Sequence, residues 1–185
     1  MLTFHRLFVC TGNTCRSPMA RVLFEEMVTK DPSLRSAGIE VDCAGAIAGG
    51  SPATPEAIQL MCDYGLDLSG HQSKLVFGRL VKWADLILVM QTRQKQVVVS
   101  RYRGAAEKTY VLTEYVGEKG EVPDPIGCGI GAYENCAALL SSLLSKLAEM
   151  LREDWKTREA AQDMAWTGPR LLGKPNSSLS NRRGH

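Results

Sequence analysis

Short apolar runs alternate with segments of helical periodicity along most of this chain. Strands are predicted for the runs 4–9, 39–44, 86–90 and 108–112. Helices are predicted, from the spacing of apolar residues and from capping signals, over 19–30, 55–64, 92–101 and 132–152. The run 86–90 is apolar at every position, which is typical of a parallel strand covered on both faces. The order of elements predicts a three-layer α/β fold, with a four-stranded parallel sheet flanked by helices.

The composition divides the chain into a domain and a C-terminal extension. Residues 1–152 contain all the predicted strands and helices and are expected to form one domain, and 153–185 form the extension. From about residue 169 onward there are four basic residues and no acidic one, together with several serine, asparagine and glycine residues. This composition predicts a disordered basic tail.

Overall composition and charge narrow the classes of partner. Of the 185 residues, 44% are hydrophobic and 23% are charged, which excludes bulk disorder. The net charge of +2 does not indicate a nucleic-acid or membrane partner. No apolar run approaches the about 18 residues of a membrane-spanning helix, and the N-terminal segment resembles a strand, not a signal peptide. We therefore expect a monomer in the reducing cytoplasm, with its six cysteines as free thiols.

One loop concentrates the candidate chemistry. The segment Cys-Thr-Gly-Asn-Thr-Cys-Arg-Ser, residues 10–17, joins the first predicted strand to the first predicted helix. Backbone N–H groups of such a loop can turn inward and hold an oxyanion such as phosphate, helped by the helix dipole. Gly12 permits close backbone approach or a positive φ, Asn13 tolerates a left-handed conformation, and Arg16 can fork onto two phosphate oxygens. The expected phosphate-binding residues are Thr11, Gly12, Asn13, Thr14, Cys15, Arg16 and Ser17.

Cys10 is expected at the base of this cradle. The N–H groups and Arg16 would favour its thiolate form, which is the nucleophile, and Ser17 could donate a hydrogen bond to the sulfur. A lone cysteine at a strand end is more often a buried, inert thiol. The joint pattern of strand, Cys-x5-Arg-Ser and helix favours the nucleophile. The loop lacks the G-x-x-x-x-G-K-[ST] pattern of nucleotide-binding loops.

The long polar loop 113–131 supplies a candidate general acid. Loops of this length inside a compact domain are usually functional. Asp124 lies between Pro123 and Pro125, which stiffen the backbone and present the carboxyl group. An aspartate before proline is also common in ordinary turns, so the pattern alone leaves both roles open.

These motifs carry a family resemblance. The stretch 10–20 resembles the signature loop of the low-molecular-weight protein tyrosine phosphatases, and especially of the bacterial branch that includes the protein arginine phosphatases. Four further matches follow in the family's order, at 42–45, 65–71, 85–90 and 124–127. The resemblance covers about residues 5 to 152.

The resemblance implies a cysteine-dependent protein phosphatase that needs no metal or cofactor and acts on a phosphorylated protein. Cys10 would attack phosphorus and form a phosphocysteine. Arg16 would hold the equatorial oxygens, and Asp124 would protonate the leaving group and later activate water.

The same resemblance assigns supporting roles outside the loop. His71 would brace Asn13, and Cys43 would support the loop at a position where the family usually has serine. A thiol donates more weakly than a hydroxyl, so this support is expected to be weaker. Cys15 would form a reversible disulfide with Cys10 under oxidation, and its alternative role is that of a packed small side chain.

Two residues bear on the phosphorylated substrate. Thr14 stands where the arginine-specific branch has threonine and tyrosine-specific relatives have isoleucine. Ile126 stands where both groups usually have an aromatic ring. Thr14 favours phosphoarginine and Ile126 favours neither, so phosphotyrosine and phosphoarginine both stay open.

Two other functions are alternatives. An arsenate reductase uses a similar anion loop but needs two further cysteines close together, whereas here no cysteine lies between Cys62 and Cys128. A non-catalytic oxyanion-binding module is expected to lack Cys10, Arg16 or Asp124, and the chain has all three.

Overall fold

Four parallel strands form the centre of the protein. The computed structural model describes residues 3–47 and 49–165. Its strands are β1 (Phe4–Cys10), β2 (Ile39–Gly45), β3 (Leu86–Val89) and β4 (Thr109–Val111). They pair in the order β2-β1-β3-β4, and each pairing is parallel. The predicted four-stranded parallel sheet is confirmed.

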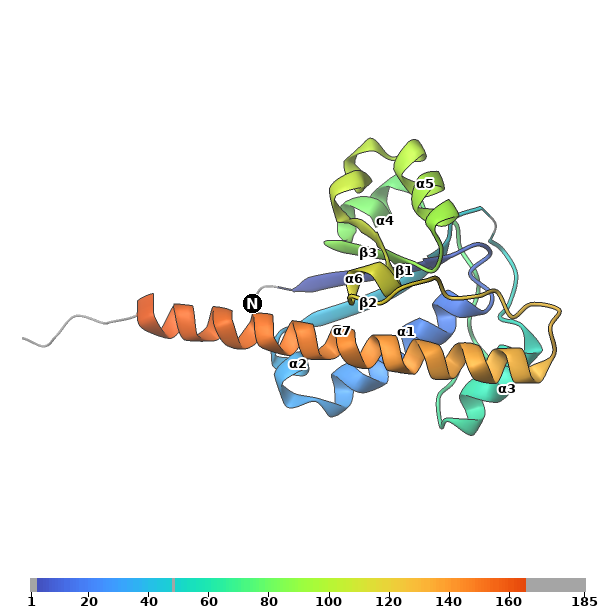
Figure 1. Cartoon of the computed structure of the whole chain (residues 1–185), viewed down its shortest axis with the longest axis horizontal. Helices are drawn as coiled ribbons and strands as arrows, with labels where there is room; N and C mark the ends of the chain where they lie inside the picture. Colours follow the sequence, from blue (N-terminus) through green and yellow to red (C-terminus); the bar gives the residue numbers. More distant parts are fainter. Residues whose placement is uncertain (1–2, 48, 166–185) are drawn as a thin grey trace, which may run out of the picture.

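Helices cover both faces of this sheet (Figure 1). On one face lie α1 (Arg16–Lys30), α2 (Pro32–Ser36), α3 (Pro55–Asp63) and α7 (Ile130–Ala165). On the other face lie α4 (Gly78–Trp83), α5 (Thr92–Arg101) and the 3-10 helix η1 (Arg103–Lys108). The short α6 (Leu112–Tyr115) directly follows β4. The predicted three-layer α/β arrangement is therefore also confirmed.

The strands alternate their side chains between two apolar cores. In β1, Phe8 packs in the core formed with α1 and α7, whereas Leu7 and Val9 pack in the core formed with α4 and α5. In β3, Leu88 packs in the first of these cores and Ile87 packs in the second. Successive side chains of a strand point to opposite faces, so a sheet covered on both sides needs apolar residues at every position. This requirement explains the continuous apolar run seen in the sequence.

The strand order places the candidate loop at the carboxyl end of an inner strand of the sheet. β1 lies between β2 and β3, and Cys10 is its last residue. The chain leaves β1 toward β2 on one side and later returns to β3 on the other. Open parallel sheets bind ligands beyond the carboxyl ends of their strands, where the order reverses in this way.

Four short helices are not predicted from apolar spacing. α2, α4, α6 and η1 have four to six residues each, too few to display a helical period. α2 depends instead on a local cap, because the Asp31 carboxylate accepts hydrogen bonds from the N–H groups of Ser33 and Leu34 at 2.9 and 3.2 Å. The same residue ends α1, so one aspartate separates two helices.

The last helix is longer than its leucine pattern predicts. α7 continues to Ala165 instead of ending near Arg152. The segment 153–165 has no glycine or proline and is rich in strong helix formers, so the helix continues after its leucine face has ended. The tail expected from about residue 169 lies outside the described residues. No helix in the described part of the chain, α7 included, is long and apolar enough to cross a membrane.

Candidate active site

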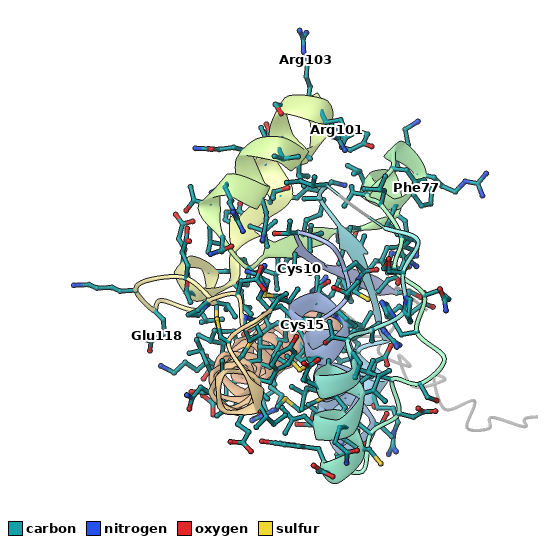
Figure 2. The ribbon with its side chains drawn as sticks, turned by 90° about the vertical axis from the view of Figure 1, so that its right-hand side faces the viewer. Cys10, Cys15, Phe77, Arg101, Arg103 and Glu118 are labelled. Atoms are coloured by element: carbon teal, nitrogen blue, oxygen red, sulfur yellow. The ribbon has the colours of Figure 1, made fainter. Side chains whose placement is uncertain are left out.

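Backbone hydrogen bonds hold the loop after β1 against the segment after β2. The Ala46 N–H donates to the Cys10 carbonyl at 2.8 Å, and the Ile47 N–H donates to the Thr11 carbonyl at 3.1 Å. These bonds extend the β1–β2 pairing beyond both strands and fix the path of the loop. Figure 2 views this face of the molecule, with Cys10 near its centre.

The sulfur of Cys10 is buried and has two polar contacts. The Ser17 Oγ lies 3.0 Å from the sulfur, and the backbone N–H of Asn13 donates to it at 3.2 Å. The Asn13 amide donates to Ser17 Oγ at 3.0 Å. The hydroxyl proton of Ser17 is then left for the sulfur or, at a longer 3.4 Å, for the Ala44 carbonyl. Hydrogen bonds of this kind stabilise negative charge on sulfur when the thiolate forms.

Asn13 takes the left-handed conformation that the loop needs. Its φ is +58°, the one positive φ among the non-glycine residues that the structure describes. The ring Nε2 of His71 lies 2.7 Å from the Asn13 carbonyl, and the backbone N–H of Lys74 donates to Asn13 Oδ1 at 3.0 Å. The strained conformation is therefore held by the segment 71–74, as the resemblance implied for His71.

Gly12 does not have the positive φ that was one of its two expected roles. It is not among the glycines with positive φ, and an added Cβ would meet nothing closer than the Thr14 Oγ1 at 3.7 Å. The neighbouring Asn13 makes the turn instead. Thr14 is partly exposed, and its carbonyl accepts the Thr54 N–H at 2.8 Å, which fastens the far side of the loop.

Arg16 is a buried cation at the start of α1. Its side chain is 2% exposed, and its terminal N–H groups donate to Gln91 Oε1 at 2.9 Å, to the Val122 carbonyl at 3.2 Å and to Thr11 Oγ1 at 3.3 Å. Its Nε is buried and has no partner. The start of α1 has no capping side chain and no acidic residue in its first turn. The guanidinium and the helix dipole therefore attract an anion to the same point.

Asp124 meets Arg16 across a separation of 108 residues. Its Oδ2 accepts a hydrogen bond from Arg16 Nη2 at 2.5 Å, and its side chain is 32% exposed. The segment before it is anchored, because the Val122 N–H donates to the Met90 carbonyl at 3.0 Å. The structure thus brings together the three residues that the sequence analysis expected to be catalytic: Cys10, Arg16 and Asp124.

Two glutamines complete the site and escaped sequence reasoning. Gln94 is fully buried, and its Nε2 donates to Thr11 Oγ1 at 3.1 Å while its Oε1 accepts the N–H groups of Met90 and Gln91 at 2.9 and 3.0 Å. Gln91 in turn accepts a hydrogen bond from Arg16. One sequence pattern could have identified them. Gln91 directly follows the apolar run and Gln94 comes three residues later, which is the spacing of a capping box at the start of α5.

Replacing Gln94 with alanine is expected to loosen the site. Two buried N–H groups would lose their acceptor, at a cost of about 1–3 kcal/mol in the free energy of unfolding. Thr11 would lose a donor, so the loop would hold oxyanions less tightly. Urea denaturation and the Ki of inorganic phosphate measure the two effects. Gln94→Glu serves as the comparison, because it keeps the acceptor for the two N–H groups but loses the donor to Thr11. If the alanine variant is as stable as the unchanged chain, this role of Gln94 is contradicted.

Two further buried cysteines, Cys15 in the loop and Cys43 in β2, are neutral thiols. Burial raises the pKa of Cys43 to about 11, although a hydrogen bond from the Asn13 side chain and the charge of Arg21 act against it. Burial, with the nearby Cys136 and Cys10 thiols, also raises the pKa of Cys15. Cys10 and Cys15 are both free in the structure. The disulfide between them stays a prediction.

The support from His71 predicts a pH-dependent stability. Burial lowers the pKa of His71, and the positive charges of Arg21 and Lys74 act in the same direction, against the hydrogen bond to Asn13 and the charge of Asp42. A histidine that is harder to protonate in the folded state stabilises fully above its unfolded pKa of about 6.5. The contribution is lost as the pH falls from about 6.5 through the lower pKa of the folded state.

The measurement is the urea midpoint between pH 8 and pH 5 for the unchanged chain and for His71→Gln. Glutamine can still donate to the Asn13 carbonyl but does not titrate. The unchanged chain is expected to lose more stability than the variant below about pH 6.5. Parallel profiles for the two proteins would refute the assignment to His71.

Comparisons with known proteins agree with this site. A model of the low molecular weight phosphotyrosine protein phosphatase family matches residues 5–157. The protein-arginine-phosphatase of Bacillus subtilis is 37% identical over 152 residues, which are 80% of this chain and 97% of that protein. The low molecular weight protein-tyrosine-phosphatase PtpB of Staphylococcus haemolyticus is 37% identical over 140 residues, 76% of this chain and 94% of that protein.

Solved structures give the same result. A low molecular weight protein tyrosine phosphatase from T. tengcongensis has a TM-score of 0.74 and 39% identity, covering 80% of this chain and 99% of its own. A mutant of the YwlE arginine phosphatase with a phosphorylated active-site serine has a TM-score of 0.76 and 35% identity, covering 82% of this chain and 97% of its own. The expected fold, enzyme class and family are thereby confirmed. The chain belongs to the low molecular weight phosphotyrosine protein phosphatase family.

Proposed function

We propose that the protein hydrolyses phosphorylated arginine or tyrosine side chains of proteins through a phosphocysteine on Cys10. One observation supports this most directly. The Cys10 sulfur sits in a short loop that also contains the buried Arg16, at a helix start with no acidic residue of its own. A phosphoryl group held there has its phosphorus next to the nucleophile and its oxygens next to the cation.

The first step forms a bond between sulfur and phosphorus. The Cys10 thiolate attacks in line while Arg16 and the loop N–H groups hold the equatorial oxygens. The bond from phosphorus to the leaving oxygen or nitrogen breaks, and Asp124 gives its proton to the departing side chain. In the free protein the Asp124 carboxylate is bound to Arg16, so an arriving phosphate displaces it from the guanidinium. The displaced carboxylate takes up a proton from solvent, and this is the proton that it gives to the leaving group.

The second step releases phosphate. Water attacks the phosphocysteine, Asp124 takes the water proton, and the bond between sulfur and phosphorus breaks. Ser17 Oγ, 3.0 Å from the sulfur, stabilises the thiolate as it leaves. Inorganic phosphate then departs, and the thiolate is ready for another cycle.

The choice between the two substrates depends on the loop and its rim. Thr14 is partly exposed beside Gly12, where its hydroxyl could bond a nitrogen-linked substrate. Ile126 is exposed in the loop of Asp124 and offers no ring for stacking. Thr14 favours phosphoarginine, and relatives of equal identity to this chain bear arginine-phosphatase and tyrosine-phosphatase names.

Two peptides of one sequence, carrying either phosphoarginine or phosphotyrosine, test this proposal. We expect phosphate release from at least one of them, measured as kcat/KM. Thr14→Ile should shift the ratio of the two kcat/KM values toward phosphotyrosine. The control Ser141→Ala, a change on α7 away from the loop, should leave this ratio unchanged. If neither peptide nor p-nitrophenyl phosphate is hydrolysed, the proposed function is wrong.

A further inference from the structure

Three large apolar side chains are exposed beside the loop that holds Cys10. Ile47 is 55% exposed, Leu75 is 42% exposed and Phe77 is 46% exposed. The Ile47 N–H is bonded to the Thr11 carbonyl, so this patch begins at the rim of the phosphate cradle. Large apolar side chains gathered at a rim are typical of a surface that contacts another molecule.

Backbone pairing holds the patch in place. Gly45 and Leu75 form a parallel bridge, with hydrogen bonds from the Gly45 N–H to the Lys74 carbonyl at 2.7 Å and from the Val76 N–H to the Gly45 carbonyl at 2.9 Å. Because side chains alternate along an extended segment, Leu75 and Phe77 share the outer face while Val76 is buried between them. The patch is therefore preorganised and loses little entropy when a partner binds.

The close approach of these two segments depends on Gly49. A Cβ at this position would lie 2.8 Å from the Leu75 N and 2.9 Å from the Lys74 carbonyl carbon, closer than backbone atoms allow. The missing side chain lets the segment that carries Ile47 lie directly on the segment that carries Leu75.

Positive charge borders the patch. Arg101, at the end of α5, donates from Nη1 to the Ala46 carbonyl at 3.2 Å, and Tyr102 donates its hydroxyl to the Val76 carbonyl at 2.8 Å. Between residues 74 and 103 the sequence has seven basic residues and one acidic residue, Asp85. The Asp85 carboxylate accepts the His5 N–H at 2.8 Å. His5 is near the start of β1, so Asp85 lies at the amino ends of the strands, opposite the end that carries Cys10.

The two outer arginines carry uncompensated charge. Within the described residues, neither Arg101 nor Arg103 forms an ion pair with a carboxylate. Figure 2 shows both residues and Phe77 on the upper part of the face that contains Cys10, with Glu118 at its left margin. Glu118 is paired with Lys146, and Lys74 beside the patch is paired with Asp42, so the uncompensated charge that remains here is that of Arg101 and Arg103.

We propose that the surface formed by Ile47, Leu75, Phe77, Arg101 and Arg103 binds the protein substrate beside its phosphorylated residue, in a segment with acidic and apolar side chains. This inference rests on the proposed phosphatase function and names the class of substrate that the site prefers. The apolar patch fits an apolar side chain, and the arginines fit carboxylates through charge-assisted hydrogen bonds. Such a surface adds affinity outside the cradle without contacting the reacting atoms.

The test compares two phosphopeptides that differ only in their flank, one with glutamate and leucine and one with glutamine and alanine. We expect kcat/KM to be about fivefold higher for the acidic peptide, with the advantage shrinking as sodium chloride screens the charges. The double variant Arg101→Gln/Arg103→Gln should remove most of this advantage. Phe77→Ala should reduce it independently of salt, and hydrolysis of p-nitrophenyl phosphate should stay unchanged in both variants.

A matched control carries the same loss of charge elsewhere. Arg35→Gln/Lys156→Gln removes two exposed cations on α2 and α7, away from the Cys10 face, and should keep the preference for the acidic peptide. The Arg103 side chain has no hydrogen bond or ion pair in the described structure, so Arg103→Gln alone separates a docking effect from a folding defect. Circular dichroism melts confirm that each variant is folded.

Binding to the Cys10→Ser protein, measured by fluorescence polarisation of the labelled peptides, provides a readout that needs no turnover. Tighter binding of the acidic peptide, lost in the arginine double variant, would support the proposal. Equal Kd values for the two peptides would overturn it even if hydrolysis is normal. A surface that instead binds RNA or anionic vesicles through these arginines, with peptide affinity unchanged, would also overturn it. Absence of p-nitrophenyl phosphate hydrolysis would contradict the phosphatase function alone.

Discussion

Replacing Cys10 with serine is expected to lower the kcat for p-nitrophenyl phosphate by a factor of about a thousand or more. A serine hydroxyl is almost entirely protonated near neutral pH, and no neighbouring base in the loop removes its proton. The substitution keeps the size of the side chain and leaves the contacts from Ser17 and the Asn13 N–H geometrically possible. The change therefore removes the nucleophile and retains the cradle.

The retained cradle separates this result from simple unfolding. Inorganic phosphate should still protect the Cys10→Ser protein from thermal denaturation, since Arg16 and the helix start are unchanged. Cys62→Ser, which replaces an exposed free thiol on α3, should have normal activity. Normal turnover by Cys10→Ser would contradict the nucleophile assignment. Loss of both turnover and phosphate binding would mean that the sulfur maintains the loop.

Replacing Asp124 with alanine is expected to slow hydrolysis by about 10²- to 10⁴-fold for substrates with poor leaving groups. The departing oxygen or nitrogen would leave without a proton, and this matters most when the leaving group is basic. The variant also frees Arg16 from its contact with the carboxylate, so oxyanions should bind at least as tightly as before. The expected result is a lower kcat together with an unchanged or lower Ki for phosphate.

A series of aryl phosphates with leaving groups of increasing pKa measures this role. The logarithm of kcat/KM should fall more steeply with leaving-group pKa for Asp124→Ala than for the unchanged chain. Glu134→Ala, which removes an exposed carboxylate at the start of α7, serves as the matched control. Equal slopes for the variant and the unchanged chain would rule out proton donation by Asp124.

Features carried by short continuous segments could be predicted from the sequence. The parallel sheet follows from apolar runs such as 86–90, and the cradle follows from eight consecutive residues at a strand end. Asp124 could be proposed because two prolines frame it, although its partner across 108 residues could not be derived from a pattern. Its contact with Arg16 depends on how the loop before α7 crosses the end of β3.

Other features depend on contacts that no local pattern encodes. Gln94 matters because β3 lies beside β1, which brings its amide to Thr11, and the same polar residue at another strand end would simply face water. The sequence left the left-handed turn open between Gly12 and Asn13, and Asn13 takes that conformation, held from outside the loop by His71 and Lys74. Short helices such as α4 arise from local geometry and packing, without a periodic signature.

The distribution of the site along the chain also determines when activity can begin during synthesis. The nucleophile loop is made early, whereas Val122 and Asp124 are made late, and α7, which packs on α1, is made after them. A nascent chain that has emerged only through β3 lacks the acid, the Val122 carbonyl that positions Arg16, and the apolar surface that buries α1. Catalytic competence is therefore expected only once these late segments have been made, together with the completed hydrophobic core.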